Sequence, residues 1–356
     1  MRSIIIFLAA TVLALWSGPP VRAEERDAAR GAIDALIERQ MRRLAIPGLS
    51  LALIQDGRIA DVQTYGYADR EAERPVAQDT LFETASLSKP AFSYYVLRQV
   101  DRGVIALDEP LAQILPHPDI QDGRAARITP RMVLSHQSGF PNWRFHNENG
   151  QLDIKFEPGS GFLYSGEGFE YLALALAHAL DTDLAGLERL MRADMRQALS
   201  CDSGPWTWSA DLKARLATGY IDGQAQDDWR IESPMVSASL FSSAPRYACV
   251  VSAILGGTGL SADMRAAMMS PQIVLSDDAE FRADFGLDAW GLGVAIKDTD
   301  FGRAISHGGI NEGFTSWFTA LRDQRAGYVF LTNSQKGPEL NAAIEDELLA
   351  FALALD

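Results

Sequence analysis

Strand-like alternation lies at the two ends of this 356-residue chain, and helical periodicity fills the middle. Residues 49–69, LSLALIQDGRIADVQTYGYAD, alternate apolar and polar side chains around Asp56-Gly57, a dipeptide typical of tight hairpins. Residues 290–306 and 315–334 each show another strand–turn–strand pattern. The strands of the two ends must therefore pair with one another, with the helices inserted between them.

The segments between these ends carry apolar residues at helical spacing. They cover residues 91–103, 129–139, 166–181, 184–199 and 244–257, and a last helix is expected over 336–356. The predicted fold is α+β: an antiparallel sheet of N- and C-terminal strands, flanked by the first and last helices, with an inserted, mainly helical lobe. The sheet lobe is expected at about 24–85 and 285–356, the helical lobe at about 90–260, and a cleft between them.

Residues 1–23 are predicted to be a secretory signal peptide. Arg2 precedes an apolar run over residues 4–16. The triplet Val21-Arg22-Ala23 begins and ends with small residues, as signal peptidase prefers. The alternative is a membrane anchor, but the run is shorter than the ~20 residues that a spanning helix needs. We expect cleavage after Ala23, a periplasmic or secreted protein without stable membrane insertion, and one catalytic domain over residues 24–356.

The formal net charge of −15 argues against two classes of partner. Binding to nucleic acid depends on Lys and Arg contacts with phosphates, and an anionic membrane surface repels an acidic protein. The charge otherwise indicates solubility alone. No nucleic-acid partner is expected, and the oligomeric state is left open.

Cys201 and Cys249 are the two cysteines of the chain. An oxidising compartment permits a disulfide between them. Two separate buried thiols, which behave as small apolar side chains, are the alternative, and the sequence leaves both open. Neither cysteine stands beside a histidine in the way that a catalytic thiol does.

The stretch ETASLSK, residues 83–89, places Ser86 three residues before Lys89. A serine hydroxyl is a weak nucleophile until a base takes its proton, and a lysine one helical turn later lies on the same helix face. If burial lowers the pKa of Lys89, its neutral amine can be that base. Pro90 lacks an N–H and belongs in the first turn, which places the helix start near Ser86. An N-cap serine followed by a surface lysine is the alternative.

Residues 81–111, LFETASLSKPAFSYYVLRQVDRGVIALDEPL, resemble the active-site segment of the serine β-lactamase and penicillin-binding protein superfamily. Further motifs follow in the superfamily's order: IPGLSLALIQDG, ITPRMVLSHQSGFPNW, PGSGFLYSGEGFEYLALAL and SHGGINEGFTSWFTAL. The resemblance covers roughly residues 46–334. It is strongest to the class C β-lactamase-like branch, which also contains D,D-peptidases, D-aminopeptidases and esterases. The resemblance implies a serine hydrolase that works through an acyl-enzyme, with no metal and no cofactor.

The resemblance also implies roles for individual residues. Ser86 is the expected nucleophile, Lys89 accepts or shares its proton, and Tyr164 passes a proton between Ser86 and the leaving group, as a phenolate or through hydrogen bonds. His307 lines the strand beside the substrate and is expected to hydrogen-bond near Tyr164. The backbone N–H groups of Ser86 and Ile310 form the expected oxyanion hole.

Two departures from the superfamily pattern bear on the substrate. The second motif is usually Tyr-x-Asn, whose Asn holds the amide of the acyl side chain, but in this chain Gly166 stands at that position. The third motif is His307-Gly308-Gly309 in place of Lys-Thr-Gly, and a mostly neutral imidazole binds an anion less well than lysine does. Gly166 and Gly309 are nevertheless expected to line the substrate site. Both departures favour an esterase or a peptidase acting on D-residues over an efficient β-lactamase.

Other polar residues near the motifs are interpreted as structural. His136 is expected to bond the backbone in the helical lobe, Glu167 to be a helix-start acid favoured by the helix dipole, and Ser88 to cap a helix rather than assist Ser86. A core tyrosine is the alternative for Tyr164. A histidine in a glycine turn is the alternative for His307.

Three other classes of protein fit less well. An α/β-hydrolase needs a Gly-x-Ser-x-Gly elbow and parallel βαβ units, and neither is present. A zinc hydrolase is disfavoured because the five histidines include no His-x-x-x-His pair. A catalytically inactive binding or sensor homologue would usually have lost one of the motif residues.

The predicted function is therefore an exported serine hydrolase. Its expected substrates are small-molecule esters or amides, or peptidoglycan-like peptides with D-residues, and its β-lactamase activity is expected to be weak or absent. A penicillin-binding D,D-peptidase or a true β-lactamase is the alternative. The sequence does not identify the natural substrate.

Overall fold

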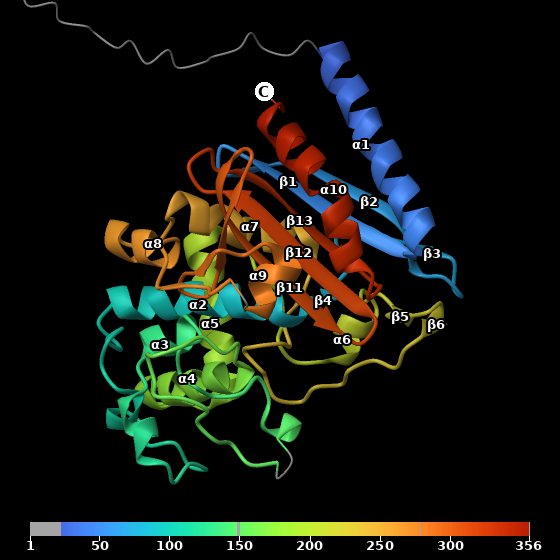
Figure 1. The fold of residues 1–356 in the computed structure, drawn as a ribbon. Coiled ribbons are helices and arrows are strands. Elements are labelled where there is room, and N and C mark those ends of the chain that lie inside the picture. Colours follow the sequence, from blue (N-terminus) through green and yellow to red (C-terminus); the bar gives the residue numbers. More distant parts are fainter. Residues whose placement is uncertain (1–22, 148–149, 278, 356) are drawn as a thin grey trace, which may run out of the picture.

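The computed structural model describes residues 23–147, 150–277 and 279–355 (Figure 1). Within these ranges, nine strands form an antiparallel sheet in the order β3-β2-β1-β13-β12-β11-β10-β9-β8. The strands are β1 (Gly48–Gln55), β2 (Arg58–Asp69), β3 (Arg74–Pro75), β8 (Ile273–Val274), β9 (Ala289–Trp290), β10 (Ala295–Thr299), β11 (Gly302–Asn311), β12 (Phe314–Leu321) and β13 (Ala326–Thr332). β1 pairs with β13, so the two ends of the chain meet in the middle of the sheet. The predicted α+β class is confirmed.

Helices cover both faces of the sheet. The first and last helices, α1 (Ala23–Leu44) and α10 (Gly337–Leu353), lie side by side on one face (Figure 1). Their apolar residues pack against the sheet in one buried cluster that includes Ile37, Phe330 and Leu348. α7 (Ala244–Gly256) packs on the other face, against β1, β2 and β13. Because both faces are covered, every residue of β12 and β13 is buried, whichever face of the sheet it points to.

The middle of the chain is mainly helical, as predicted. It contains α2 (Ser88–Asp101), α3 (Pro130–Leu134), α4 (Gly166–Ala179), α5 (Leu184–Leu199), α6 (Ala210–Lys213), α8 (Ala262–Met268) and α9 (Glu280–Phe285). Short 3₁₀ turns are η1 (Ala85–Leu87), η2 (Leu111–Gln113), η3 (Gly123–Arg127) and η4 (Arg144–His146). Two small two-stranded sheets pair β4 (Phe82–Glu83) with β7 (Phe241–Ser242) and β5 (Tyr220–Ile221) with β6 (Gln224–Ala225). The exact bounds of the two lobes and the treatment of residues 24–356 as one domain stay predictions.

One helix start differs slightly from the prediction. Pro90 lies in the first turn of α2, as expected, but the α-helix begins at Ser88 and not at Ser86. Ser86 belongs to η1, whose first residue, Ala85, has a left-handed backbone with φ of 49°. Thr129 caps α3 through its side-chain oxygen, and Pro130 occupies the first helical position.

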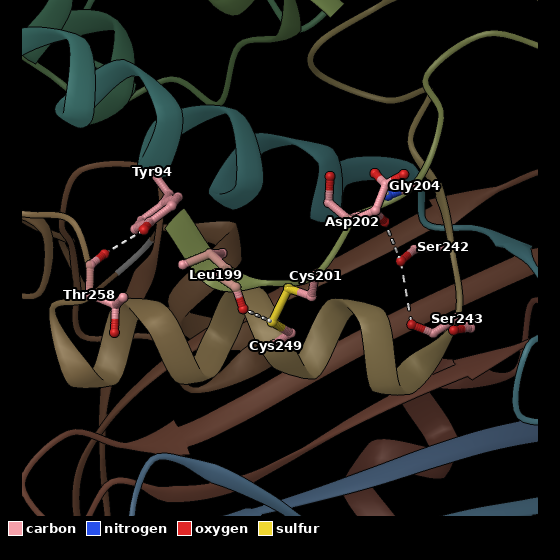
Figure 2. The surroundings of a disulfide bond; sticks show 10 residues. Tyr94, Leu199, Cys201, Asp202, Gly204, Ser242, Ser243, Cys249 and Thr258 are labelled. Atoms are coloured by element: carbon pink, nitrogen blue, oxygen red, sulfur yellow. Dashed lines mark hydrogen bonds between the residues drawn. A yellow bond between two sulfur atoms is a disulfide. The ribbon is translucent and has the colours of Figure 1, made fainter. Parts of the chain in front are cut away.

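Cys201 and Cys249 form a disulfide, which settles the alternative that the sequence left open. The bond joins the segment after α5 to the middle of α7 (Figure 2). The carbonyl oxygen of Leu199, the last residue of α5, lies 3.9 Å from the Cys249 sulfur. The disulfide therefore ties the helical region to the helix that packs on the sheet.

The predicted signal peptide, residues 1–23, falls outside the described residues except for Ala23, the first residue of α1. Across residues 23–147, 150–277 and 279–355, no helix combines the length and the apolar character that crossing a membrane requires.

Candidate active site

Ser86 lies in η1, between β4 and α2, on a backbone held from two sides. Thr84 donates through its backbone N–H and its hydroxyl to the carbonyl oxygen of Leu240, at 2.9 Å and 2.8 Å. The Ser316 hydroxyl, on β12, donates to the carbonyl oxygen of Thr84 at 2.5 Å. The left-handed conformation of Ala85 is uncommon for a residue with a Cβ, and these contacts hold it.

Lys89 is buried on the first turn of α2, with 1% of its surface exposed. Its Nζ lies 3.3 Å from Ser86 Oγ and donates to the carbonyl oxygen of Ser237 at 3.0 Å. It also lies 4.6 Å from the ring centroid of Tyr164. Burial lowers the pKa of Lys89 to about 7, and the Glu170 carboxylate partly offsets this effect. A large fraction of the amine is therefore neutral near pH 7, as a base for Ser86 must be.

Glu170 and Ser237 complete the surroundings of Lys89, and sequence reasoning missed both. The Glu170 carboxylate accepts hydrogen bonds from the Ser237 backbone N–H at 3.0 Å and from the Ser237 hydroxyl at 2.5 Å. Burial raises the pKa of Glu170, while the bonds from Ser237 and the charge of Lys89 lower it. An acid within a helix is usually exposed, so only its position in α4, shortly after Tyr164, could have drawn attention to it.

Tyr164 is placed by the start of α4. Ser165 caps this helix, since its hydroxyl accepts from the Gly168 N–H at 2.9 Å, and its own N–H donates to His136 Nδ1 at 3.0 Å. His136 therefore binds backbone, as expected. Its ring also lies 4.3 Å from the Tyr164 ring and packs against it. Burial raises the pKa of the Tyr164 phenol, an effect that the Ser86 side chain partly opposes. A phenol that is protonated near neutral pH can act through hydrogen bonds.

His307 lies on β11 and faces the same site, but it does not form the hydrogen bond expected near Tyr164. Its Nδ1 is 2.7 Å from the carbonyl oxygen of Gly308, and its Nε2 has no hydrogen-bond partner among the described residues. The ring centroids of His307 and Tyr164 are 6.1 Å apart. Burial and the charge of Lys89 lower the pKa of His307 to about 3, so the imidazole is neutral and supplies no cation.

The third motif approaches the nucleophile through glycine. A Cβ at Gly309 would lie 2.4 Å from the carbonyl oxygen of Thr84 and 2.8 Å from the backbone nitrogen of Ser86. Only glycine lets β11 come this close to η1. The next residue, Ile310, is 50% exposed. This contact brings the two segments of the expected oxyanion hole together.

Gly166 and Gly308 make room for tryptophan rings. A Cβ at Gly166 would lie 2.9 Å from Cη2 of Trp143. A Cβ at Gly308 would lie 2.4 Å from Cζ3 of Trp317, its partner across β11 and β12. In both motifs that depart from the superfamily pattern, a large apolar side chain thus occupies the space next to the glycine.

A cavity of about 190 Å³ opens beside Ser86. Ser86, Tyr164 and His307 stand at it. Its other walls are mainly apolar, with side chains from α9, from the strands β9, β11 and β12 and from the loop before β9: Phe281, Phe285, Leu287, Trp290, Ile310 and Trp317. Within the part of the chain that the structure describes, none of its lining residues is Lys, Arg, Asp or Glu.

Two further residues have structural roles. The Ser88 hydroxyl accepts from the Leu240 N–H at 3.0 Å, so its predicted capping role is wrong: α2 has no side-chain cap, and Ser88 instead anchors the segment before β7. Glu167 stands in the first turn of α4, as predicted, and also forms a buried ion pair with Arg144 at 2.8 Å. Neither side chain contacts Ser86 in these interactions.

Comparison with known proteins agrees with this arrangement. A family profile described as Beta-lactamase matches residues 33–352. The chain belongs to the Beta-lactamase family. The superfamily resemblance found in the motifs is thereby confirmed, and the solved structures with similar folds include class C β-lactamases and penicillin-binding protein homologues.

Relatives within the Beta-lactamase family carry names that denote different activities. Esterase EstB of Burkholderia gladioli is 29% identical over 54% of this chain and 55% of its own length, so the chain spans about half of that relative. Penicillin-binding protein 4* of Bacillus subtilis (strain 168) is 24% identical over 82% of this chain and 69% of its own. Among solved structures, EstCE1, a hydrolase with promiscuous acyltransferase activity, superposes with a TM-score of 0.78 at 18% identity, over 92% of this chain and 100% of its own. At this sequence identity, the similarity to EstCE1 shows a shared fold and nothing more.

Proposed function

We propose that this chain is an exported serine hydrolase that cleaves esters, in preference to β-lactams, through an acyl-enzyme on Ser86. The observation that carries the proposal is the contact between Lys89 Nζ and Ser86 Oγ at 3.3 Å, with a lysine pKa of about 7. A surface lysine beside an N-cap serine would be exposed and fully charged near pH 7, whereas Lys89 is buried and a large fraction of its amine is neutral.

The residues can perform each proton transfer of the reaction. Lys89 takes the hydroxyl proton as Ser86 Oγ attacks the ester carbonyl. The backbone N–H groups of Ser86 and Ile310 hold the oxyanion that develops on the carbonyl oxygen. When the C–O bond breaks, the alcohol leaves with a proton passed through Tyr164. Water then attacks the acyl-enzyme, which releases the carboxylic acid and restores Ser86.

The same site is poorly equipped for β-lactams. At Gly166 no side-chain amide is available to hold the acyl amide, and Trp143 fills that space. His307 is neutral and cannot pair with the β-lactam carboxylate as lysine does. The esterase among the sequence relatives supports this preference, while Penicillin-binding protein 4* keeps D,D-peptidase activity open as the second candidate.

Export is supported by two features. The leader over residues 1–23 has the pattern of a cleavable signal peptide. The Cys201–Cys249 disulfide is of the kind that persists in oxidising compartments such as the periplasm.

Intact-mass spectrometry tests the proposal. The protein is incubated with a fluorophosphonate probe and, separately, with a penicillin, beside a Ser86→Ala control. We expect a probe adduct on the wild type and none on Ser86→Ala, no lasting penicillin adduct and no penicillin turnover. Ester turnover should fall at least about a thousandfold in Ser86→Ala.

Two results would redirect the assignment. A stable penicilloyl adduct on Ser86 would indicate a penicillin-binding D,D-peptidase. Absence of any adduct with either reagent would indicate a catalytically inactive homologue.

A further inference from the structure

The position of the cavity beside Ser86 indicates which part of an ester substrate it can hold. Tyr164 and His307 stand at its mouth together with Ser86. In the proposed reaction, Tyr164 returns the proton to the departing oxygen. Because Tyr164 and Ser86 both line the cavity, the departing oxygen that takes this proton lies next to it. The cavity is therefore placed to hold the alcohol part of an ester.

The walls of the cavity are aromatic rings. Phe281 stacks on Tyr164 with ring centroids 5.0 Å apart and an interplanar angle of 24°. Phe285 packs against Trp317 at 5.6 Å, and Trp317 lies over Gly308, where a Cβ would displace it. Trp290 meets Phe281 edge-on at 5.9 Å. Rings in these arrangements suit a flat apolar guest, which they can contact on its face and at its edge.

The size of the cavity limits that guest. Its volume is about 190 Å³. An apolar cavity of about 150 Å³ can take up benzene in another protein. One aromatic ring with few substituents therefore fits this cavity.

The charge of the cavity limits the guest further. Among the described residues that line it, none is Lys, Arg, Asp or Glu, and the His307 imidazole is neutral. A carboxylate inside the cavity would lose its water without gaining a cation, which is strongly unfavourable. Lys89 does not remedy this, because its Nζ is engaged with Ser86 and the Ser237 carbonyl.

We propose that this cavity binds the alcohol part of the substrate, and that the substrates are esters of uncharged aromatic alcohols of one ring, such as phenols and benzyl alcohols. This inference rests on the proposed function, since it assigns a substrate class to the same site. It predicts that selectivity depends on the alcohol part of an ester more than on its acyl part.

Steady-state kinetics with paired esters test this assignment. Phenyl acetate and 3-carboxyphenyl acetate differ by one carboxylate on the alcohol part, and phenyl butyrate differs from phenyl acetate only in the acyl part. We expect kcat/KM for 3-carboxyphenyl acetate to be roughly tenfold or more below that for phenyl acetate, because the carboxylate is buried without a cation. The change from acetate to butyrate should alter kcat/KM less.

A positive charge introduced at Ile310, which lines the cavity, provides a second test. Ile310 lines the cavity and is half exposed, so Ile310→Lys can fold with its ammonium near the guest, and Ile310→Gln is the uncharged control. The lysine should raise the ratio of kcat/KM for 3-carboxyphenyl acetate over phenyl acetate several-fold relative to the glutamine. Val274→Ala, a change at an exposed residue outside the cavity, should leave the ratio unchanged.

The outcomes separate the two levels of the proposal. Equal rates for the neutral and carboxylated esters, or a larger effect of acyl length than of the carboxylate, would overturn the assignment of the cavity while Ser86-dependent ester hydrolysis stands. An identical ratio in Ile310→Lys and Ile310→Gln would overturn it as well. No Ser86-dependent hydrolysis of any of these esters would overturn the proposed function itself.

Discussion

The Trp143 ring lies directly against Gly166, at the position where the superfamily motif usually has asparagine. A Cβ at Gly166 would lie 2.9 Å from Cη2 of Trp143 and 3.0 Å from the carbonyl oxygen of Asn142. The Gly166 N–H also donates to the Asn142 side chain at 3.0 Å. The loss of the asparagine is thus matched by a ring that occupies its space.

Restoring this asparagine alone should not restore β-lactam binding. In Gly166→Asn the new side chain collides with Trp143 and the Asn142 backbone, and we expect the free energy of unfolding to fall by about 1–3 kcal/mol. Combination with Trp143→Ala should recover part of that loss. Thermal melts and turnover of a chromogenic cephalosporin are the measurements. Efficient cephalosporin hydrolysis by the single variant would show that Trp143 does not block an asparagine at this position.

The pH dependence of ester hydrolysis should report Lys89. The base must be neutral, and the neutral fraction of Lys89 grows as the pH rises through its pKa of about 7. We therefore expect kcat/KM for an uncharged ester to rise through about pH 7 and to level off above it. A profile that is flat across this range would show that another group sets the rate.

Glu170 should shift that profile. Its carboxylate raises the pKa of Lys89, so Glu170→Gln, which removes the charge and keeps an acceptor for Ser237, should move the rise in kcat/KM to lower pH. Glu167→Gln is the matched control, because it changes the same residue type on the same helix at a site paired with Arg144. If both variants shift the profile equally, the effect is not specific to the contact with Lys89.

Phe281 and Tyr164 both line the cavity beside Ser86 and also a second cavity of about 630 Å³. Phe281→Ala should join the two, so that 2-naphthyl acetate gains in kcat/KM relative to phenyl acetate. The absolute rate for phenyl acetate should fall, since the ring that stacks on Tyr164 is lost. Competition assays with the two esters measure the ratio, and no change in it would mean that Phe281 does not limit the alcohol part.

The disulfide should contribute to stability more than to catalysis. It joins residues 48 positions apart, and in the chain-entropy description a loop of this length corresponds to roughly 4 kcal/mol. The double variant Cys201→Ser/Cys249→Ser should lose up to about that amount in urea unfolding. Its kcat/KM at 25 °C should stay close to that of the wild type, because neither cysteine lines the cavity beside Ser86. An unchanged unfolding midpoint would contradict this expectation.

Local pattern in the sequence was sufficient for the main elements. Alternation around Asp56-Gly57 predicted β1 and β2, and the helical spacing of apolar residues predicted α4, α5 and α7. These patterns report burial of one face, which depends on neighbours in the chain. The spacing of Ser86 and Lys89 likewise identified a possible pair, because one helical turn places both side chains on one face.

Tertiary structure alone decided which groups surround that pair. The Ser237 carbonyl bonds Lys89, and the charge of Glu170 acts on Lys89, from segments that are distant in the chain. Trp317 covers Gly308 only through the pairing of β11 with β12. The start of α2 and the bond between Cys201 and Cys249 also depended on packing that no local pattern encodes. The sequence by itself therefore determined the elements and the candidate pair Ser86 and Lys89, whereas the pKa of Lys89 and the apolar cavity arise from long-range burial, which exists only in the folded chain.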